Sequence, residues 1–168
     1  MKTRPVVTFL CMGLLSFLFE ARAESTNKLD ELARLPFGLK VVHTPDKVRA
    51  ESGGTSGRAF TWTYKTSVTA TNGSAVVKEF GSFVWHDGKW MFSTFSGKPF
   101  TADNFAEWYS CPAAKLAEGR EFSDSSNWTG GDTLRGGKMK WYFIAVTADG
   151  RKVKGEAIVE ILPEVSNP

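Results

Sequence analysis

Two Asx-Gly dipeptides, each flanked by alternating apolar and polar residues, constrain the fold of this chain more than any other feature. They are Asn72-Gly73 and Asp87-Gly88. Such dipeptides favour two-residue turns with a positive φ at the central residues, and these turns join neighbouring antiparallel strands. Residues 58–95 are therefore predicted to form two successive β-hairpins.

Two-residue turns also fix the register of the strands that they join. The partners predicted across the two turns are Ala70 with Ala75, Val68 with Val77, Trp62 with Phe83, Phe60 with Trp85, Trp85 with Trp90 and Phe83 with Phe92. All of these side chains fall on one face, which predicts a continuous, buried aromatic surface. The same register places Tyr64 opposite Gly81, where an aromatic ring can cover the bare backbone.

A further hairpin is predicted over residues 137–162, around the turn 148–150. A three-residue loop with Gly150 in the left-handed conformation brings the apolar faces of the two arms together and sets Phe143 over Gly155. A two-residue loop would instead place Phe143 beside Glu156, so the three-residue loop is preferred.

The segment between these hairpins has a different character. Thr101 or Asp103 is a good N-cap for a short helix that carries an aromatic face and ends at Cys111-Pro112. Residues 113–137 are rich in Gly, Ser and Asp and show little periodicity. We expect them to be irregular, either as a functional loop or as a packed crossover between sheets.

The remaining elements are shorter. Residues 24–35 have leucines at helical spacing and are expected to form a short helix, 37–43 a first strand, and 44–57 a loop or a weak edge strand. The predicted fold is mainly β, an antiparallel β-sandwich of six to eight strands with one or two short helices. A small barrel is the alternative.

The N-terminus has the layout of a cleavable secretory signal. A basic start precedes the apolar run 6–19, and Ala21-Arg22-Ala23 has the small-x-small form of a cleavage site. We expect a signal peptide over 1–23, one domain over 24–162, a disordered tail over 163–168, and a secreted or periplasmic location without a transmembrane segment in the mature form. An uncleaved anchor is the alternative, although this run of 14 residues is shorter than the roughly 20 that span a bilayer.

Charge and cysteine content narrow the possible partners. Removal of 1–23 would leave 18 basic and 17 acidic side chains, a net charge of +1. A near-neutral domain has no strong field to hold a polyanion, so nucleic-acid binding is not expected. Cys111 would be the sole remaining cysteine, and it is expected to be a buried small side chain or to form an intermolecular disulfide.

Candidate chemistry lies in the segment between the hairpins. The chain has two distant histidines and no typical metal-ligand spacing, so neither a metal nor a cofactor is predicted. Aromatic faces beside short polar side chains suit a sugar or similar ring. The candidate ligand-binding residues are Trp108, Tyr109, Phe122, Asp124, Asn127, Trp128 and Asp132. The alternative is that these rings close the open end of the sheet.

The function that these features favour is an exported, non-enzymatic binding or interaction domain. Its partner would be a small molecule, a glycan or a protein. Two alternatives remain: an envelope-associated structural subunit, and a small secreted enzyme that uses Cys111 or acidic residues of the 101–132 region.

Overall fold

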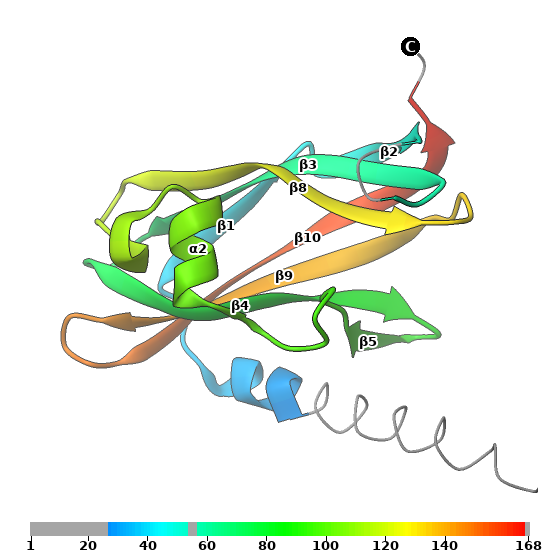
Figure 1. The fold of residues 1–168 in the computed structure, drawn as a ribbon. Helices are drawn as coiled ribbons and strands as arrows, with labels where there is room; N and C mark the ends of the chain where they lie inside the picture. The colour runs from blue at the N-terminus through cyan, green and yellow to red at the C-terminus, as the bar shows by residue number, and fades with distance from the viewer. Residues whose placement is uncertain (1–26, 54–56, 167–168) are drawn as a thin grey trace, which may run out of the picture.

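The computed structural model describes residues 27–53 and 57–166 and confirms the mainly β class with short helices. The predicted signal peptide lies outside the described residues. Ten strands form one mixed sheet in the described part of the chain. The sheet curls so that β8 at one edge faces β4 and β5 at the other, and the result is a half-barrel (Figure 1).

The sheet has a simple path. Strand β3 pairs on one side with β8 and on the other with β1 and β2; β2 then leads through β10 and β9 to β4 and β5. The short strands β6 and β7 pair with β4. The bounds are β1 Leu39–Thr44, β2 Lys47–Ser52, β3 Phe60–Ala70, β4 Ala75–His86, β5 Lys89–Phe92, β6 Phe100–Thr101, β7 Lys115–Leu116, β8 Glu121–Gly131, β9 Gly137–Thr147 and β10 Lys152–Val165.

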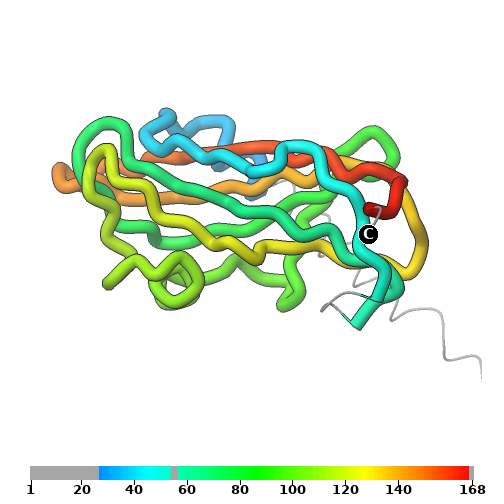
Figure 2. The backbone as a smooth tube through the Cα atoms, turned by 90° about the horizontal axis from the view of Figure 1, so that it is seen from above, coloured from blue at the N-terminus to red at the C-terminus, as the bar shows by residue number. Residues whose placement is uncertain are grey.

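One strand pair is parallel, whereas the sequence predicted antiparallel pairing throughout. It joins β10 to β2, which is the segment expected to be a loop or a weak edge strand. The parallel direction arises because β10 comes back beside β2 after a long excursion of the chain, not through a hairpin turn. In Figure 2 the 148–150 turn and the end of β10 lie at opposite ends of the half-barrel.

Two of the three predicted hairpins are confirmed, with the predicted register. In the β4–β5 hairpin Phe83 lies opposite Phe92 and Trp85 opposite Trp90. In the β9–β10 hairpin Phe143 lies opposite Gly155, and Gly150 has a φ of +82°. The three-residue loop is therefore correct.

The predicted hairpin around Asn72-Gly73 is wrong. Gly73 does adopt a positive φ of +85°, but β3 and β4 do not pair with each other. The chain instead crosses from one wall of the half-barrel to the other, and β4 takes β9 as its partner. None of the cross-strand pairs predicted around this turn forms, from Ala70 with Ala75 to Phe60 with Trp85, and Gly81 is covered by the ring of Tyr142 instead of Tyr64.

A β-bulge in β4 explains why the single aromatic face is also wrong. The register with β9 shifts between Val77 and Glu79, so the side chains that follow exchange faces. Val77 and Phe80 point into the half-barrel, whereas Phe83 packs on the outer face. The other rings of the β4–β5 hairpin also lie on the outer face; they are Trp85, Trp90 and Phe92.

The N-terminal helix covers part of this outer face. Residues 27–34 are helical in the described chain, in agreement with the leucine spacing. Leu32 is buried against Phe83, Tyr142 and Ile144, and Leu29 and Leu35 pack at the margin of this cluster. In Figure 1 the helix lies beneath β4, on the side opposite to the interior of the half-barrel.

The segment between the hairpins is more regular than expected. Helix α2, Ala102–Trp108, begins at the predicted N-cap Thr101, whose side chain accepts a hydrogen bond from the backbone of Asn104. The 3-10 turn η1, Pro112–Ala114, follows it. The irregular segment predicted for 113–137 is wrong, because β8 forms the edge of the sheet there. The sequence of β8 shows no clear alternation of apolar and polar residues, because most of its residues are polar and a second bulge interrupts the pattern.

The C-terminal end is also better ordered than predicted. Residues 163–165 continue β10, where Val165 is the partner of Ala50. The backbone N–H of Ser166 then donates to the carbonyl of Ala50 at 2.7 Å. A disordered tail from residue 163 is therefore wrong, because β2 offers these residues backbone partners.

Candidate functional site

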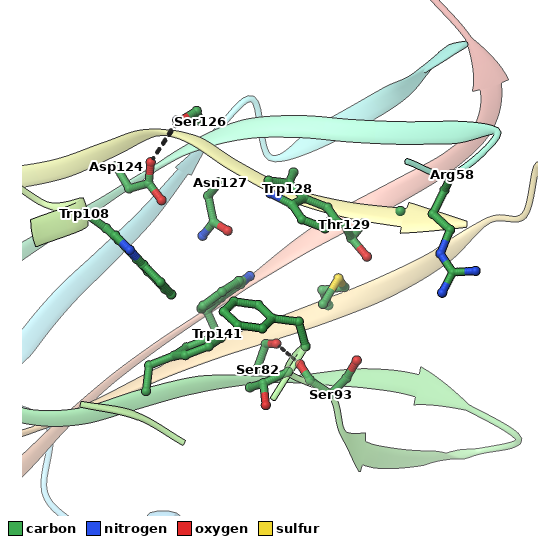
Figure 3. A pocket seen from close by; sticks show the side chains of 15 residues that line it. Arg58, Ser82, Ser93, Trp108, Asp124, Ser126, Asn127, Trp128, Thr129 and Trp141 are labelled. Carbon is green, nitrogen blue, oxygen red and sulfur yellow. Dashed lines mark hydrogen bonds between the residues drawn. The ribbon is translucent and has the colours of Figure 1, made fainter. Parts of the chain in front are cut away.

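A groove of about 540 Å³ opens between β8 and the β4–β5 hairpin, where the half-barrel is not closed by another strand (Figure 3). One wall belongs to β8 and consists of Asp124, Ser126, Asn127, Trp128, Thr129 and Gly130. The opposite wall and the floor combine polar and apolar side chains, namely Ser82, Ser93, Thr94, Phe95, Phe100, Trp108, Met139 and Trp141. Arg58 lies at the end that is farther from α2 (Figure 3).

A β-bulge shapes the β8 wall. The register between β3 and β8 shifts by one residue between Tyr64 and Thr66, so two residues of β8 lie opposite Lys65. Asp124 Oδ1 accepts hydrogen bonds from the backbone N–H of Ser126 at 2.9 Å and from its hydroxyl at 3.3 Å. The bulged backbone therefore has its own hydrogen-bond partner.

The bulge determines which side chains enter the groove. Residues three apart on a regular strand point to opposite faces. Because the bulge adds one residue, Asp124 and Asn127 both point inward, and both line the groove. Figure 3 shows Asn127 between Trp108 and Trp128, directed toward the groove.

A hydrogen bond on the side away from the groove fixes the side chain of Asn127. Its Nδ2 donates to Thr66 Oγ1 at 2.9 Å, and the side chain is 7% exposed. The same hydroxyl lies 3.0 Å from His43 Nδ1. Three neighbouring strands thus contribute one buried chain of hydrogen bonds, which fixes the amide nitrogen of Asn127 and leaves its oxygen toward the groove.

Aromatic side chains form the floor. Trp141 donates from Nε1 to the hydroxyl of Tyr64 at 2.8 Å. The ring of Trp108 contacts Phe100 edge to face, with centroids 4.8 Å apart. Trp141 and Phe100 are buried and Trp108 is partly buried, whereas Trp128 is 42% exposed at the rim.

Charge in the groove is sparse and balanced. Asp124 supplies one negative charge, and Arg58 one positive charge at the far end. Arg58 Nη1 lies 2.8 Å from Asp132 Oδ2 in an exposed ion pair. The groove therefore has little net charge, and its recognition chemistry rests on hydrogen bonds and apolar contact.

Burial shifts the pKa of three groups in the interior of the protein. It lowers the pKa of His43 to about 4, because a buried imidazole disfavours its charged form. Burial also raises the pKa of the Tyr64 hydroxyl. Cys111 is fully buried, and burial raises the pKa of its thiol. All three groups are uncharged at neutral pH.

The structure brings together four of the seven predicted ligand-binding residues: Trp108, Asp124, Asn127 and Trp128 all line the groove. The other three lie elsewhere. Tyr109 and Phe122 are buried in the core, and Asp132 is an exposed partner of Arg58. Trp128 stands on strand β8, not on the loop where it was expected.

Sequence reasoning missed the half of the groove that the hairpins provide. Ser82, Met139 and Trp141 lie on β4 and β9, whose inner faces were expected to be committed entirely to the core. The bulge in β4 removes Phe83 from this face and leaves it open beside β8. No local signal marks that bulge, because Lys78 reads as an ordinary exposed strand residue.

The described residues lack two further features that would bear on function. No group of three or more His, Cys, Asp or Glu side chains is placed to hold a metal ion in residues 27–53 and 57–166. No helix within those ranges is long and apolar enough to cross a membrane.

Comparison with known proteins adds little to this geometry. No protein-family model matches the chain, and no curated protein matches it. Among solved structures, it resembles a Bordetella pertussis protein named ApaA, at 15% identity and a TM-score of 0.44, over 77% of this chain and 97% of that one. It also resembles a structural-genomics target, SoR45, at 12% identity and a TM-score of 0.47, over 80% of this chain and 94% of that one. Likenesses this distant carry no conclusion about function.

Proposed function

We propose that this protein is an exported, non-enzymatic binding domain and that the groove beside β8 is its binding site. Export rests on the signal-like sequence of residues 1–23. The ligand is a small polar molecule, or the end of a larger one, with an apolar face. One observation carries the proposal: a concave site holds exposed aromatic surface next to hydrogen-bonding groups that are fixed from behind.

The rigidity of the site supports a binding role. Asp124 and Asn127 are positioned by a bulge and by buried hydrogen bonds, so neither side chain has to be ordered when a ligand arrives. Preorganised groups bind more tightly because less conformational entropy is lost on association.

Two observations favour binding over catalysis. Cys111 is buried outside the groove, and its raised pKa keeps the thiol protonated at neutral pH, whereas a nucleophilic cysteine needs an accessible thiolate. Asp124 is the one carboxylate among the described groove residues, whereas most glycoside hydrolases need a pair.

Two tryptophans provide a matched test of the site. Trp128 and Trp85 are each 42% exposed, but Trp128 lies at the groove and Trp85 on the outer face of the β4–β5 hairpin. We expect compounds that raise the melting temperature of the wild type to bind at least about tenfold more weakly to Trp128→Ala, since an aromatic face in the site would be lost. Trp85→Ala should bind them as the wild type does.

The measurement is a thermal-shift screen of small polar compounds, followed by titration calorimetry on each hit. Equal loss of binding in both variants, or loss in Trp85→Ala alone, would place the site elsewhere. Circular dichroism of both variants checks that each is folded.

A further inference from the structure

We infer that the groove recognises a neutral polyhydroxylated ring, the sugar unit of a glycan. This inference rests on the proposed function and specifies the ligand class of the same site. Three properties of the groove lead to it: the kind of hydrogen-bonding groups on the β8 wall, the arrangement of the aromatic rings, and the balance of charge.

The β8 wall contains two hydrogen-bond acceptors that have no donor in the described chain. Asp124 Oδ1 is engaged with Ser126, while Asp124 Oδ2 has no donor among the described residues. Asn127 Nδ2 is engaged with Thr66, and the oxygen of the same amide likewise has no donor in the described chain. The ligand must therefore bring at least two hydrogen-bond donors to neighbouring points on this wall.

Hydroxyl groups on the ligand would also pair with the other polar side chains of the groove. The side chains of Thr129 and Ser93 line it from opposite walls, and each hydroxyl can both donate and accept. A ligand hydroxyl can donate to the fixed acceptors on β8 and accept from such side chains. A ligand with hydrogen-bond donors alone would not use the hydroxyl donors of Thr129 and Ser93. A ligand with hydrogen-bond acceptors alone could not pair with the carboxylate of Asp124.

Most aromatic rings of the groove pack on one another, and only part of the aromatic surface is accessible. The rings of Phe100 and Trp108 contact each other, and Trp141 stacks at 6.4 Å on Phe100, so these rings are largely occupied by their neighbours. Trp128 has no ring partner in the described chain and is 42% exposed beside the acceptors. Phe95 also lines the groove and is 78% exposed, so two rings offer accessible faces there. Accessible ring faces next to hydrogen-bond acceptors match the apolar face and equatorial hydroxyls of a pyranose.

Charge separates this ligand class from two others. An anion would approach the uncompensated carboxylate oxygen of Asp124, which disfavours it. An organic cation would be attracted by Asp124, but cation recognition works best when several ring faces converge on one point. Here the floor rings pack on one another, and the two exposed rings, Trp128 and Phe95, make no ring contact with each other, so a neutral ring fits better than either ion.

The first test is direct binding of chosen probes. The full mature protein is applied to immobilised neutral glycans and sialylated glycans, and is titrated with tetramethylammonium in solution. We expect retention on one or more neutral glycans, at least about tenfold weaker binding to sialylated forms of the same structures, and no saturable binding of tetramethylammonium. Retention on the sialylated forms alone, or binding of tetramethylammonium without any neutral glycan, would overturn the inference.

The second test removes one acceptor. Asp124→Asn keeps an oxygen for Ser126 but replaces a free carboxylate oxygen by an amide, and we expect the neutral glycan to bind about tenfold to a hundredfold more weakly. Glu121→Gln is the control, because Glu121 lies on the same strand but bonds to Lys65 and Ser67 outside the groove. Loss of one ligand hydroxyl in a deoxy analogue should weaken binding to the wild type and have little further effect on Asp124→Asn.

The possible results separate the inferred ligand class from the proposed binding function. If a compound other than a neutral glycan binds in a manner that depends on Trp128, the binding domain stands and the ligand class is wrong. If no probe binds here and the wider screen also finds no ligand that depends on Trp128, both fail. An unchanged affinity of Asp124→Asn for a bound glycan would contradict the role given to the acceptors.

Discussion

The two halves of the half-barrel both contain aromatic side chains, but one half is a closed core and the other is an open groove. In the half beneath α2, Phe105 and Tyr109 pack on Phe80 and Phe143, and all four rings are buried. In the other half, the interior is left open between β8 and the β4–β5 hairpin, and part of its aromatic surface reaches solvent. In Figure 1 the helix stands before one half of the interior and nothing stands before the other.

The comparison shows that aromatic content alone does not separate core from site. What separates them is whether the chain supplies its own covering element. Seven residues of α2 and the turn η1 cover one half. The other half leaves part of its aromatic surface exposed, at Trp128 and Phe95, so its stability is expected to depend less on these side chains.

The largest contrast should come from removing one ring in each half. Phe80→Ala takes away a fully buried ring that contacts six others, and we expect it to lower the free energy of unfolding by roughly 3 to 5 kcal/mol. Phe95→Ala removes a ring that is 78% exposed at the groove, and its effect should stay within about 0.5 kcal/mol. Urea unfolding measures both, and similar losses would mean that the open half is as tightly packed as the closed one.

A second contrast concerns the polar residues behind the groove. Because burial lowers the pKa of His43 to about 4 from an unfolded value near 6.5, the unfolded chain binds more protons between these pH values. The contribution of neutral His43 is therefore present in full above pH 6.5 and is lost as the pH falls toward 4, by roughly 3 kcal/mol in total.

This dependence is measured as the free energy of unfolding between pH 4 and pH 8. His43→Asn should flatten the profile between pH 4 and pH 6.5, whatever its effect on stability at neutral pH. A wild-type profile that is flat down to pH 4 would contradict the burial of His43.

The smallest contrast comes from adding one methyl group to each half. A Cβ at Gly155 would lie 2.7 Å from Leu39 Cβ and 2.9 Å from the Leu39 carbonyl oxygen, so Gly155→Ala should cost about 1 to 3 kcal/mol. A Cβ at Gly137, at the open end of β9, meets no atom within 4 Å. Gly137→Ala should be neutral or stabilise slightly, because it reduces the entropy of the unfolded chain. Thermal unfolding of the two variants compares them, and the reverse order would show that the sheet is loose where β1 crosses β10.

The sequence predicted local structure well and long-range pairing less well. Asn72-Gly73 and Asp87-Gly88 carry the same signal, and in both the glycine has a positive φ. One closes a hairpin and the other leads across the interior. Turn chemistry specifies how the chain reverses over a few residues, whereas the choice of strand partner depends on side chains far away in the sequence, such as those of β9.

Bulges account for most of the remaining differences. Each inserts one residue into a strand and moves all later side chains to the other face. The bulge in β4 sent Phe83 outward, and the bulge in β8 concealed a strand whose inward side chains would otherwise alternate. Four candidate residues lie at the groove because they belong to this concealed strand or to α2, which the capping pattern did predict.

The bulge of β8 has a further consequence for the behaviour of the protein in concentrated solution. In the described chain β8 pairs with β3 alone, so its other edge carries unpaired backbone groups that could template the strand of a second molecule. A continuous ladder requires a regular repeat, and the extra residue interrupts it while Asp124 occupies the N–H of Ser126. The same irregularity that turns Asn127 toward the groove thus makes the exposed edge a poor seed for aggregation.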